Sequence, residues 1–368
     1  MVFKQIAYLC VKQIRTLALI KKNNFNLILS TLYRGVTDIR NLLFDKKIIR
    51  SVSFPLPIIS IGNLAVGGTG KTPHTEYFIR LLKDNYRIAT LSRGYKRKTT
   101  GFFQANKHTT AADIGDEPFQ IFTKFPDVRV FVDEKRVHGV QEILKTHPDM
   151  EVILLDDAYQ HRHIHPGLSI LLTDFALPFT RDHVMPYGRL REQANNARRA
   201  DVILVTKCPK EIKQEDFQRI TNEINPTPHQ SVFFSGLAYD EIYPVFGGEK
   251  ITADTLQNTD VLVVSGIENP APMVKYIKSL VKSVEILTFA DHHHFSAKEL
   301  EEIQEKSKNK IIITTEKDAA RLKSITYLTD KLKEKIYALP LQIKILNNQE
   351  NTFHQKIYDY VGKNSRNR

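Results

Sequence analysis

Short apolar runs, each closed by polar or turn-forming residues, alternate along most of the chain with longer segments of helical spacing. The runs are short and rich in β-branched residues, which predicts strands. They are Ile58–Ile61, Arg87–Ser92, Val128–Val132, Glu151–Leu155, Leu168–Thr173, Asp201–Thr206 and Ser231–Ser235. The segments between them predict helices over His74–Lys83, Pro118–Phe125 and Val137–Thr146. This alternation is typical of an α/β fold with a largely parallel sheet, where ligands bind at the carboxyl ends of the strands.

The alternation lapses over Tyr239–Lys250 and then resumes. New strands are expected at Val261–Ser265, Val284–Phe289 and Lys310–Thr315, with helices at Pro272–Lys282 and Ala297–Ser307. The pattern therefore predicts N-terminal helices over residues 1–50, a main core over 51–240, a linker over 241–250 and a smaller α/β domain over 251–368 that closes on the active site.

The first fifty residues are apolar on one helical face and basic on another. The apolar faces hold Phe3, Ile6, Cys10, Ile14 and Leu17 over residues 3–22, and Leu32, Val36, Ile39 and Leu43 over Leu27–Phe44. Basic residues interrupt the first stretch, so neither a membrane-spanning helix nor a cleavable signal peptide is predicted. Such helices lie in a membrane interface or pack on a core, and the pattern alone leaves both open.

Charge adds to this picture. The 368 residues carry a formal charge of +12, and residues 1–50 hold ten lysines and arginines against two aspartates. A basic segment of this kind suits lipid headgroups or nucleic acid, but no aromatic-rich strand face or helix-turn-helix pattern supports nucleic acid as a partner. Cys10 and Cys208 give neither a disulfide framework nor a metal cluster, as expected in a reducing compartment.

A glycine-rich stretch, Gly62–Pro73, lies between an expected strand and an expected helix, which is the context of a phosphate-binding loop. Glycines let successive N–H groups point at phosphate oxygens, and the helix N-terminus favours negative charge. Lys71 would reach the β- and γ-phosphates, and the Thr72 hydroxyl would bind the Mg²⁺ between them. Alanine at position 65 departs from the strict pattern. The expected nucleotide-binding residues are Ala65, Val66, Gly67, Gly68, Thr69, Gly70, Lys71 and Thr72.

Two pairs of acids are candidates for the chemistry. Asp156 and Asp157 end an apolar strand, as expected of the strand end that holds Mg²⁺ directly or through water in P-loop proteins. Asp116 and Glu117 stand just before Pro118 at an expected helix start. In isolation the second pair would only offset the helix dipole.

Basic and histidine-rich segments offer further candidates. Ser92–Lys98 follows a strand and would hold a substrate phosphate or form a solvated charge run. Histidines gather over His161–His165 and His292–His294. No cysteine or carboxylate spacing completes a zinc site, which favours a catalytic or phosphate-contacting role over a structural metal.

Seven segments, taken together and in order, resemble the tetraacyldisaccharide 4′-kinase family, the lipid A 4′-kinases of Gram-negative bacteria. They are Ser60–Pro73, Ser92–Tyr95, Gly115–Pro118, Leu155–His161, Gly188–Glu192, Phe289–His293 and Thr315–Ala319. The resemblance runs from about Leu32 to Arg321 and makes residues 51–240 the P-loop nucleotide-binding kinase core.

This resemblance implies transfer of the ATP γ-phosphate to the 4′-hydroxyl of a tetraacyl disaccharide 1-phosphate, with Mg²⁺. It matches Asp116 to the acid that takes the hydroxyl proton and His292 to its histidine partner. An aspartate held by a histidine can accept that proton while keeping the hydroxyl aligned for attack. Candidates for holding Mg²⁺ are Thr72, Glu117, Asp156 and Asp157. Residues matched on the acceptor side are Arg93, Arg136, Gln160, His161 and Glu192.

The implied substrate also bears on the N-terminal segment and on location. An acceptor with four acyl chains places the enzyme at a bilayer, which favours peripheral association of residues 3–22 with an anionic membrane surface. The family implies the cytoplasmic face of the bacterial inner membrane. The oligomeric state stays open.

Two other functions compete with a lipid kinase. A P-loop switch or partitioning ATPase with a protein or DNA partner carries a similar loop, but usually has lysine where this chain has Val66. A GTP-dependent metal chaperone would need a guanine-reading Asn-Lys-x-Asp segment. The nearest candidate, Val205–Cys208, lacks both the Asn and the Asp.

Overall fold

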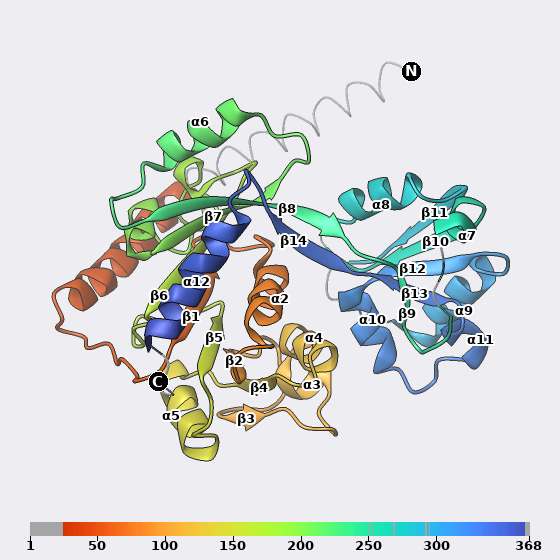
Figure 1. Ribbon diagram of the computed structural model, residues 1–368, viewed down its shortest axis with the longest axis horizontal. Helices are drawn as coiled ribbons and strands as arrows, with labels where there is room; N and C mark the ends of the chain where they lie inside the picture. Colours follow the sequence, from red (N-terminus) through yellow and green to blue (C-terminus); the bar gives the residue numbers. More distant parts are fainter. Residues whose placement is uncertain are drawn as a thin grey trace.

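The computed structural model of the protein describes residues 25–249, 251, 253–267, 269–290, 293 and 295–364. The expected helix over residues 3–22 and the predicted catalytic His292 lie outside the described residues. The described chain is a mixed α/β structure with a large sheet and a small sheet (Figure 1). This confirms the predicted fold class.

Within the described chain, nine strands form the large sheet in the order β14-β8-β7-β6-β1-β5-β2-β4-β3. They are β1 (Ile58–Asn63), β2 (Ile88–Ser92), β3 (Phe103–Gln104), β4 (Arg129–Val132), β5 (Val152–Asp156), β6 (Leu168–Asp174), β7 (Val202–Cys208), β8 (Ser231–Tyr239) and β14 (Leu341–Ile345). Neighbouring strands run parallel except where β3 meets β4 and β14 meets β8.

Helices cover both faces of this sheet, which explains why its central strands are apolar throughout. They are α2 (Lys71–Leu82), α3 (Ala111–Ile114), α4 (Asp116–Lys124), α5 (Arg136–Thr146), α6 (Gln214–Ile224) and α12 (Glu350–Asn364). Successive residues of β5 face opposite sides, so Val152 and Leu154 join one buried cluster while Ile153 and Leu155 join another. Short 3₁₀ turns lie at Phe179–Arg181 and Ala194–Arg199.

The small sheet has the order β11-β10-β12-β13-β9 in the described residues. Its strands are β9 (Tyr243–Pro244), β10 (Asp260–Ser265), β11 (Ser283–Thr288), β12 (Ile311–Thr315) and β13 (Ile336–Leu339). The helices around it are α7 (Ala253–Gln257), α8 (Ala271–Lys278), α9 (Ala297–Lys306), α10 (Glu316–Lys323) and α11 (Asp330–Lys333). We call residues 243–339 the small unit.

The end of the chain returns to the large sheet, which differs from the sequence-based grouping of residues 251–368. Strand β14 pairs antiparallel with β8, and Phe353, Ile357 and Val361 of α12 are buried in the same cluster as Ile59 of β1. Figure 1 shows β8 and β14 running together toward the small unit. The small unit is therefore inserted between two strands of the large sheet. Strand β9, which falls in the expected linker, pairs with β13.

We call the described chain outside the small unit, which is built around the large sheet, the large unit, and residues 25–45 form a helix on its surface. One face points outward and is apolar, with Phe25, Ile28, Leu32, Val36 and Ile39 each at least 61% exposed. The opposite side is held by polar contacts, among them the Ser30 hydroxyl, which donates to the Val184 carbonyl at 2.6 Å. Nothing in the described part of the chain is a helix long and apolar enough to cross a membrane.

Candidate active site

The loop between β1 and α2 adopts a conformation that glycine makes accessible. Gly67 and Gly70 have φ angles of 99° and 88°, in the left-handed region where other residues are strained. The Asn63 amide donates to the Thr69 hydroxyl at 2.7 Å, which ties the end of β1 to the loop. Helix α2 starts at Lys71, so its free N–H groups face the loop as an anion site requires.

His74 braces the loop from behind. Its Nδ1 lies 2.7 Å from the Gly70 carbonyl oxygen and its Nε2 lies 2.9 Å from the Ser235 hydroxyl. Burial lowers the pKa of His74 to about 4, so the ring is neutral near pH 7. A carbonyl only accepts hydrogen bonds, so Nδ1 carries the proton and donates to Gly70.

Lys71 lies beside the acid pair at the end of β5. Its Nζ is 3.7 Å from Oδ1 of Asp157. Arg191 also holds this carboxylate, with Nη1 2.8 Å from Oδ1 and Nη2 3.2 Å from Oδ2. Burial opposes ionisation of Asp157, but Lys71 and Arg191 outweigh it and lower its pKa.

Asp156 has a different environment from its neighbour. It is 2% exposed, and its Oδ1 accepts a hydrogen bond from the Thr75 hydroxyl at 3.0 Å. Burial, together with the negative charges of Glu117 and Asp157, raises the pKa of Asp156 to about 7. Glu117 is thus close enough to Asp156 to raise its pKa, and it lines the cavity together with Thr72.

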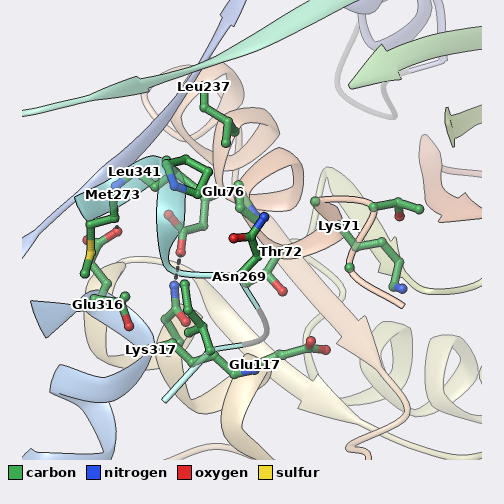
Figure 2. A pocket seen from close by; sticks show the side chains of 18 of the residues that line it. Lys71, Thr72, Glu76, Glu117, Leu237, Asn269, Met273, Glu316, Lys317 and Leu341 are labelled. Atoms are coloured by element: carbon green, nitrogen blue, oxygen red, sulfur yellow. Dashed lines mark hydrogen bonds between the residues drawn. The ribbon is translucent and has the colours of Figure 1, made fainter. Parts of the chain in front are cut away.

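A cavity of about 400 Å³ extends from this loop to the small unit. Figure 2 shows Lys71 at one side of the cavity and Met273, Leu341 and Glu316 at the other. Leu237 of β8 and Asn269 of the small unit complete the view. Both units therefore build the cavity walls.

A second cavity, of about 650 Å³, adjoins the first at Glu117, which lines both. Its walls include Asp116 and the basic residues Lys96 and Lys98. The Ser92–Lys98 segment thus contributes charge here, although Arg97 turns inward and forms an ion pair with Glu134.

Asp116 is the first residue of α4 and contacts the small unit. Arg321 of α10 donates to its Oδ2 from Nη2 at 3.0 Å and from Nε at 3.3 Å. The same guanidinium donates from Nη1 to Asp318 at 2.8 Å and to the Gly266 carbonyl at 3.0 Å. The Arg321 side chain is only 4% exposed, so this junction is buried. His293, next to the undescribed His292, lies 3.0 Å from Glu299 and stacks on Phe289.

Arg136 is a buried cation with unused hydrogen-bonding capacity. Its Nη1 donates to the Asp133 carbonyl at 2.5 Å, whereas Nε and Nη2 have no hydrogen-bond partner among the described residues. Burial lowers the pKa of Arg136 to about 10, an effect that Asp156 and Asp157 oppose. Burial also lowers the pKa of His161 to about 4, helped by the charge of Arg136. Arg93 is exposed at the end of β2.

Gln160 and Glu192 form a separate polar network. The Gln160 amide donates to the Asn63 carbonyl at 2.9 Å and to Glu192 Oε1 at 3.2 Å. Glu192 is 2% exposed, and its oxygens also accept hydrogen bonds from Arg199 at 2.7 Å and from Asn41 at 2.7 Å. Asn41 belongs to the helix over residues 25–45, so this network joins that helix to the site.

The structure thus gathers Lys71, Thr72, Glu117, Asp156 and Asp157 around one end of the cavity, with Arg136 and His161 close by. Sequence reasoning missed two arginines of this region. Arg191 lies in a segment that the resemblance singled out, yet nothing local indicates its partner. Arg321 reaches Asp116 across 205 positions of sequence, which leaves no local signal at all.

This chain is similar to several known proteins. A family model described as "Tetraacyldisaccharide-1-P 4'-kinase" matches residues 24–361. A tetraacyldisaccharide 4'-kinase of Bacteroides thetaiotaomicron is 48% identical over 353 residues, which cover 92% of this chain and 93% of the relative. One of Flavobacterium johnsoniae is 47% identical over 334 residues, covering 90% and 95%.

Among solved structures, the "apo" form of LpxK from Aquifex aeolicus in complex with ATP matches with a TM-score of 0.71 and 30% identity. The match covers 91% of this chain and 98% of that one. These matches confirm the resemblance carried by the seven sequence segments. The chain belongs to the tetraacyldisaccharide 4′-kinase family.

Proposed function

We propose that this chain transfers the γ-phosphate of ATP to the 4′-hydroxyl of a tetraacyldisaccharide 1-phosphate, as its family name indicates. The observation that carries this proposal is the shared wall at Glu117, between a cavity lined by Lys71 and Thr72 and one lined by Asp116. A triphosphate in the first cavity and a sugar hydroxyl in the second meet at the start of α4, which is the proximity that transfer requires.

Asp116 is assigned the role of base. It takes the proton of the 4′-hydroxyl as that oxygen bonds to the γ-phosphorus, while the bond to the β–γ bridging oxygen breaks and ADP leaves. The ion pair with Arg321 fixes the orientation of the Asp116 carboxylate. His292 stays the proposed partner of Asp116 by family resemblance.

Lys71 and the loop N–H groups supply most of the acceleration, because phosphoryl transfer has a loose transition state stabilised by charge and positioning. Without nucleotide, Asp157 balances the Lys71 charge. When a γ-phosphate binds, Lys71 contacts it instead, and Arg191 continues to hold Asp157.

The oxygen donors fit Mg²⁺, which prefers carboxylates, a hydroxyl, phosphate oxygens and water. Thr72, Asp156 and Glu117 would hold it, since the negative charge of Glu117 raises the pKa of Asp156 and a bound cation would offset that repulsion. Held by these residues, Mg²⁺ would supply positive charge that offsets the charge of the ATP phosphates. Asp157 is assigned instead to orienting Lys71.

Acceptor contacts are assigned to Arg93, Arg136 and His161, with Arg136 offering two buried donors to a phosphate oxygen. Gln160 and Glu192 are assigned to positioning. The oxygens of Glu192 already serve Arg199 and Asn41, which anchors the surface helix beside the acceptor site.

That helix is the proposed membrane contact. Its outward stripe of Phe25, Ile28, Leu32, Val36 and Ile39 is unpartnered in the described chain and fits the apolar boundary of a bilayer. A lipid acceptor held at a membrane reaches the site along this side. We accordingly assign the protein to the cytoplasmic face of the inner membrane.

A kinase assay tests the function. Purified protein is given Mg²⁺-ATP and a tetraacyldisaccharide 1-phosphate in detergent, and ADP and phosphorylated lipid are measured together. Asp116→Asn is expected to lower the turnover number by about 10²- to 10⁴-fold with ATP affinity near normal. Asp127→Asn, an exposed aspartate just beyond α4, is the control and keeps full activity. ADP release without lipid product would favour the switch ATPase instead.

Membrane contact is tested by co-sedimentation with vesicles that contain anionic phospholipid. The double variant Leu32→Glu and Val36→Glu is expected to lose most vesicle binding while retaining activity on detergent-dispersed substrate. Ile286→Glu, on an exposed strand position of the small unit, is the control. Undiminished binding of the double variant would place the membrane contact elsewhere.

A further inference from the structure

The end of the cavity opposite Lys71 combines apolar walls with a buried ion cluster. Its apolar residues are Leu237, Tyr239, Met273 and Leu341, contributed by both units, and Glu316 lies among them (Figure 2). We call these five residues the base end. Apolar walls suit a flat aromatic ring, and a few polar groups then decide which ring is accepted.

The ion cluster joins the two units. The Lys124 ammonium of α4 lies 2.7 Å from Oε2 of Glu76 and forms a second ion pair with Glu316 of α10. Glu76 is 1% exposed and Glu316 is 8% exposed. Lys124 thus faces two buried carboxylates, and Glu76 has a second cation, Arg80, at 3.3 Å. Glu316 shares its lysine partner with this other carboxylate.

The carboxylates of Glu76 and Glu316 differ in how many hydrogen bonds their oxygens accept from the protein. Glu76 accepts from the Gln120 amide at 2.7 Å on Oε1, and from Lys124 at 2.7 Å and Arg80 at 3.3 Å on Oε2. Among the described residues, Glu316 accepts one long hydrogen bond on Oε2, from the Leu341 N–H at 3.4 Å. Lys124 supplies charge at its Oε1, but in a geometry that makes no hydrogen bond to that atom. Glu316 therefore retains acceptor capacity.

Asp318, the other acid of the segment Thr315–Ala319, differs from Glu316 because its oxygens are occupied by hydrogen bonds from the protein. Asp318 is fully buried and accepts hydrogen bonds from the Gly266 N–H at 2.9 Å, the Thr315 hydroxyl at 2.8 Å and Arg321 at 2.8 Å. Its role is to hold the start of α10 in place. Within the segment Thr315–Ala319, Glu316 is thus the acid that lines the nucleotide cavity.

We propose that Glu316 accepts a hydrogen bond from the exocyclic amino group of adenine and thereby makes the site select ATP over GTP. This assignment rests on the proposed kinase function. Adenine presents an amino group where guanine presents a carbonyl oxygen, so a carboxylate attracts the first base and repels the second. A buried acceptor built for a donor discriminates strongly, because the wrong base leaves it unpaired.

The test measures nucleotide affinity without lipid, by isothermal titration calorimetry with Mg²⁺ present. The probes are ATP and purine riboside triphosphate, which lacks only the amino group. Wild type is expected to bind ATP about 10- to 100-fold more tightly than purine riboside triphosphate. In Glu316→Met that preference is expected to fall to roughly twofold. Lys124 keeps Glu76 as its partner in this variant, which limits damage to the fold.

Glu76→Gln is the matched control. Its oxygens are occupied by protein donors, so it is expected to keep the preference for ATP even where affinity for both probes falls. A purely structural role of Glu316 would weaken both nucleotides equally and leave their ratio unchanged, and that result would overturn the assignment. Equal loss of the preference in Glu316→Met and Glu76→Gln would also overturn it.

A second variant keeps the proposal testable if the first folds poorly. The amide of Glu316→Gln can donate to the guanine carbonyl, so the ratio of ATP to GTP affinity is expected to fall by about tenfold. An unchanged ratio would refute the base-reading role. Wild type that binds no triphosphate would refute the proposed kinase function as well, which separates the two failures.

Discussion

The nucleotide cavity has two ends that are built in opposite ways. The phosphate end comprises the loop Gly67–Thr72 and the strand-end acids Asp156 and Asp157, all from the large unit. The base end draws its residues from β8, β14 and the small unit. The phosphate end is formed by a short loop and the end of a neighbouring strand. The base end is formed by residues from two separate units that pack against each other.

This difference separates two kinds of contribution. At the phosphate end, charges and N–H groups act on atoms whose bonds change, so a lost side chain lowers the rate of transfer. At the base end, packing acts equally on bound substrate and transition state, so a lost side chain weakens binding. A substitution at the base end that lowers the rate of transfer, or one at the phosphate end that only weakens binding, would show that the two ends are not independent.

Among substitutions at the two ends of the cavity, the largest effect on the turnover number is expected for Lys71→Ala. Removing the ammonium that stabilises the transferring phosphoryl group is expected to lower the turnover number by about 10²- to 10³-fold. Steady-state transfer at saturating ATP measures it. Lys83→Ala, just beyond the other end of α2 and paired only with Asp84 among the described residues, should leave the rate unchanged. Full activity of Lys71→Ala would remove the phosphate-loop assignment.

Arg321→Met tests the buried junction between Asp116 and the small unit. The change leaves Asp116 without the ion pair that fixes it and Asp318 as a buried charge, so we expect a loss of about 3–5 kcal/mol in unfolding free energy. Misplacement of Asp116 should also lower turnover by roughly 100-fold. Urea unfolding and transfer assays measure both. Arg219→Met removes an exposed ion pair and should alter neither.

Leu237→Ala addresses the base end alone. Removing part of an apolar wall is expected to raise the dissociation constant of ATP by about tenfold. The turnover number at saturating ATP should change by less than about twofold. Ile286→Ala, at a 43% exposed site outside the cavity, is the control. A lower turnover number with unchanged affinity would contradict the division of roles.

The last expected effect is on stability alone and concerns pH and His161. Burial lowers the folded pKa of His161 to about 4 from an ordinary value of 6.5. As pH falls, the unfolded chain takes up the proton first, so stability is lost between these two values. From pH 7 to pH 5 this histidine should cost at most about 2 kcal/mol. Urea unfolding of His161→Gln should lack that loss, whereas His108→Gln, an exposed site, should retain it.

The local sequence pattern was sufficient to predict the structure of the phosphate end. The run before Gly62, the glycines and the apolar strand that ends at Asp156 are all contiguous in sequence, and each structure follows from its own residues. The parallel sheet follows as well, because alternating strands and helices leave few other arrangements.

The structure of the base end could not be predicted from the local sequence pattern. Strand β14 is short and follows Pro340, and its partner β8 lies about a hundred positions earlier. The register of Leu341 against Tyr239 comes from packing of α12 and β14 on the large sheet, and no local periodicity encodes it. The same holds for Lys124 between Glu76 and Glu316, three side chains from three helices.

The insertion of the small unit between β8 and β14 has a mechanical consequence. Residues Leu237 and Leu341, which line the cavity, sit on the very strands that carry the chain out to the small unit and back. Any rotation of that unit about this two-stranded ribbon would therefore twist the cavity wall itself. Such a rotation would change the width of the cavity and the separation of Arg321 from Asp116 at the same time, because both depend on the same pair of strands.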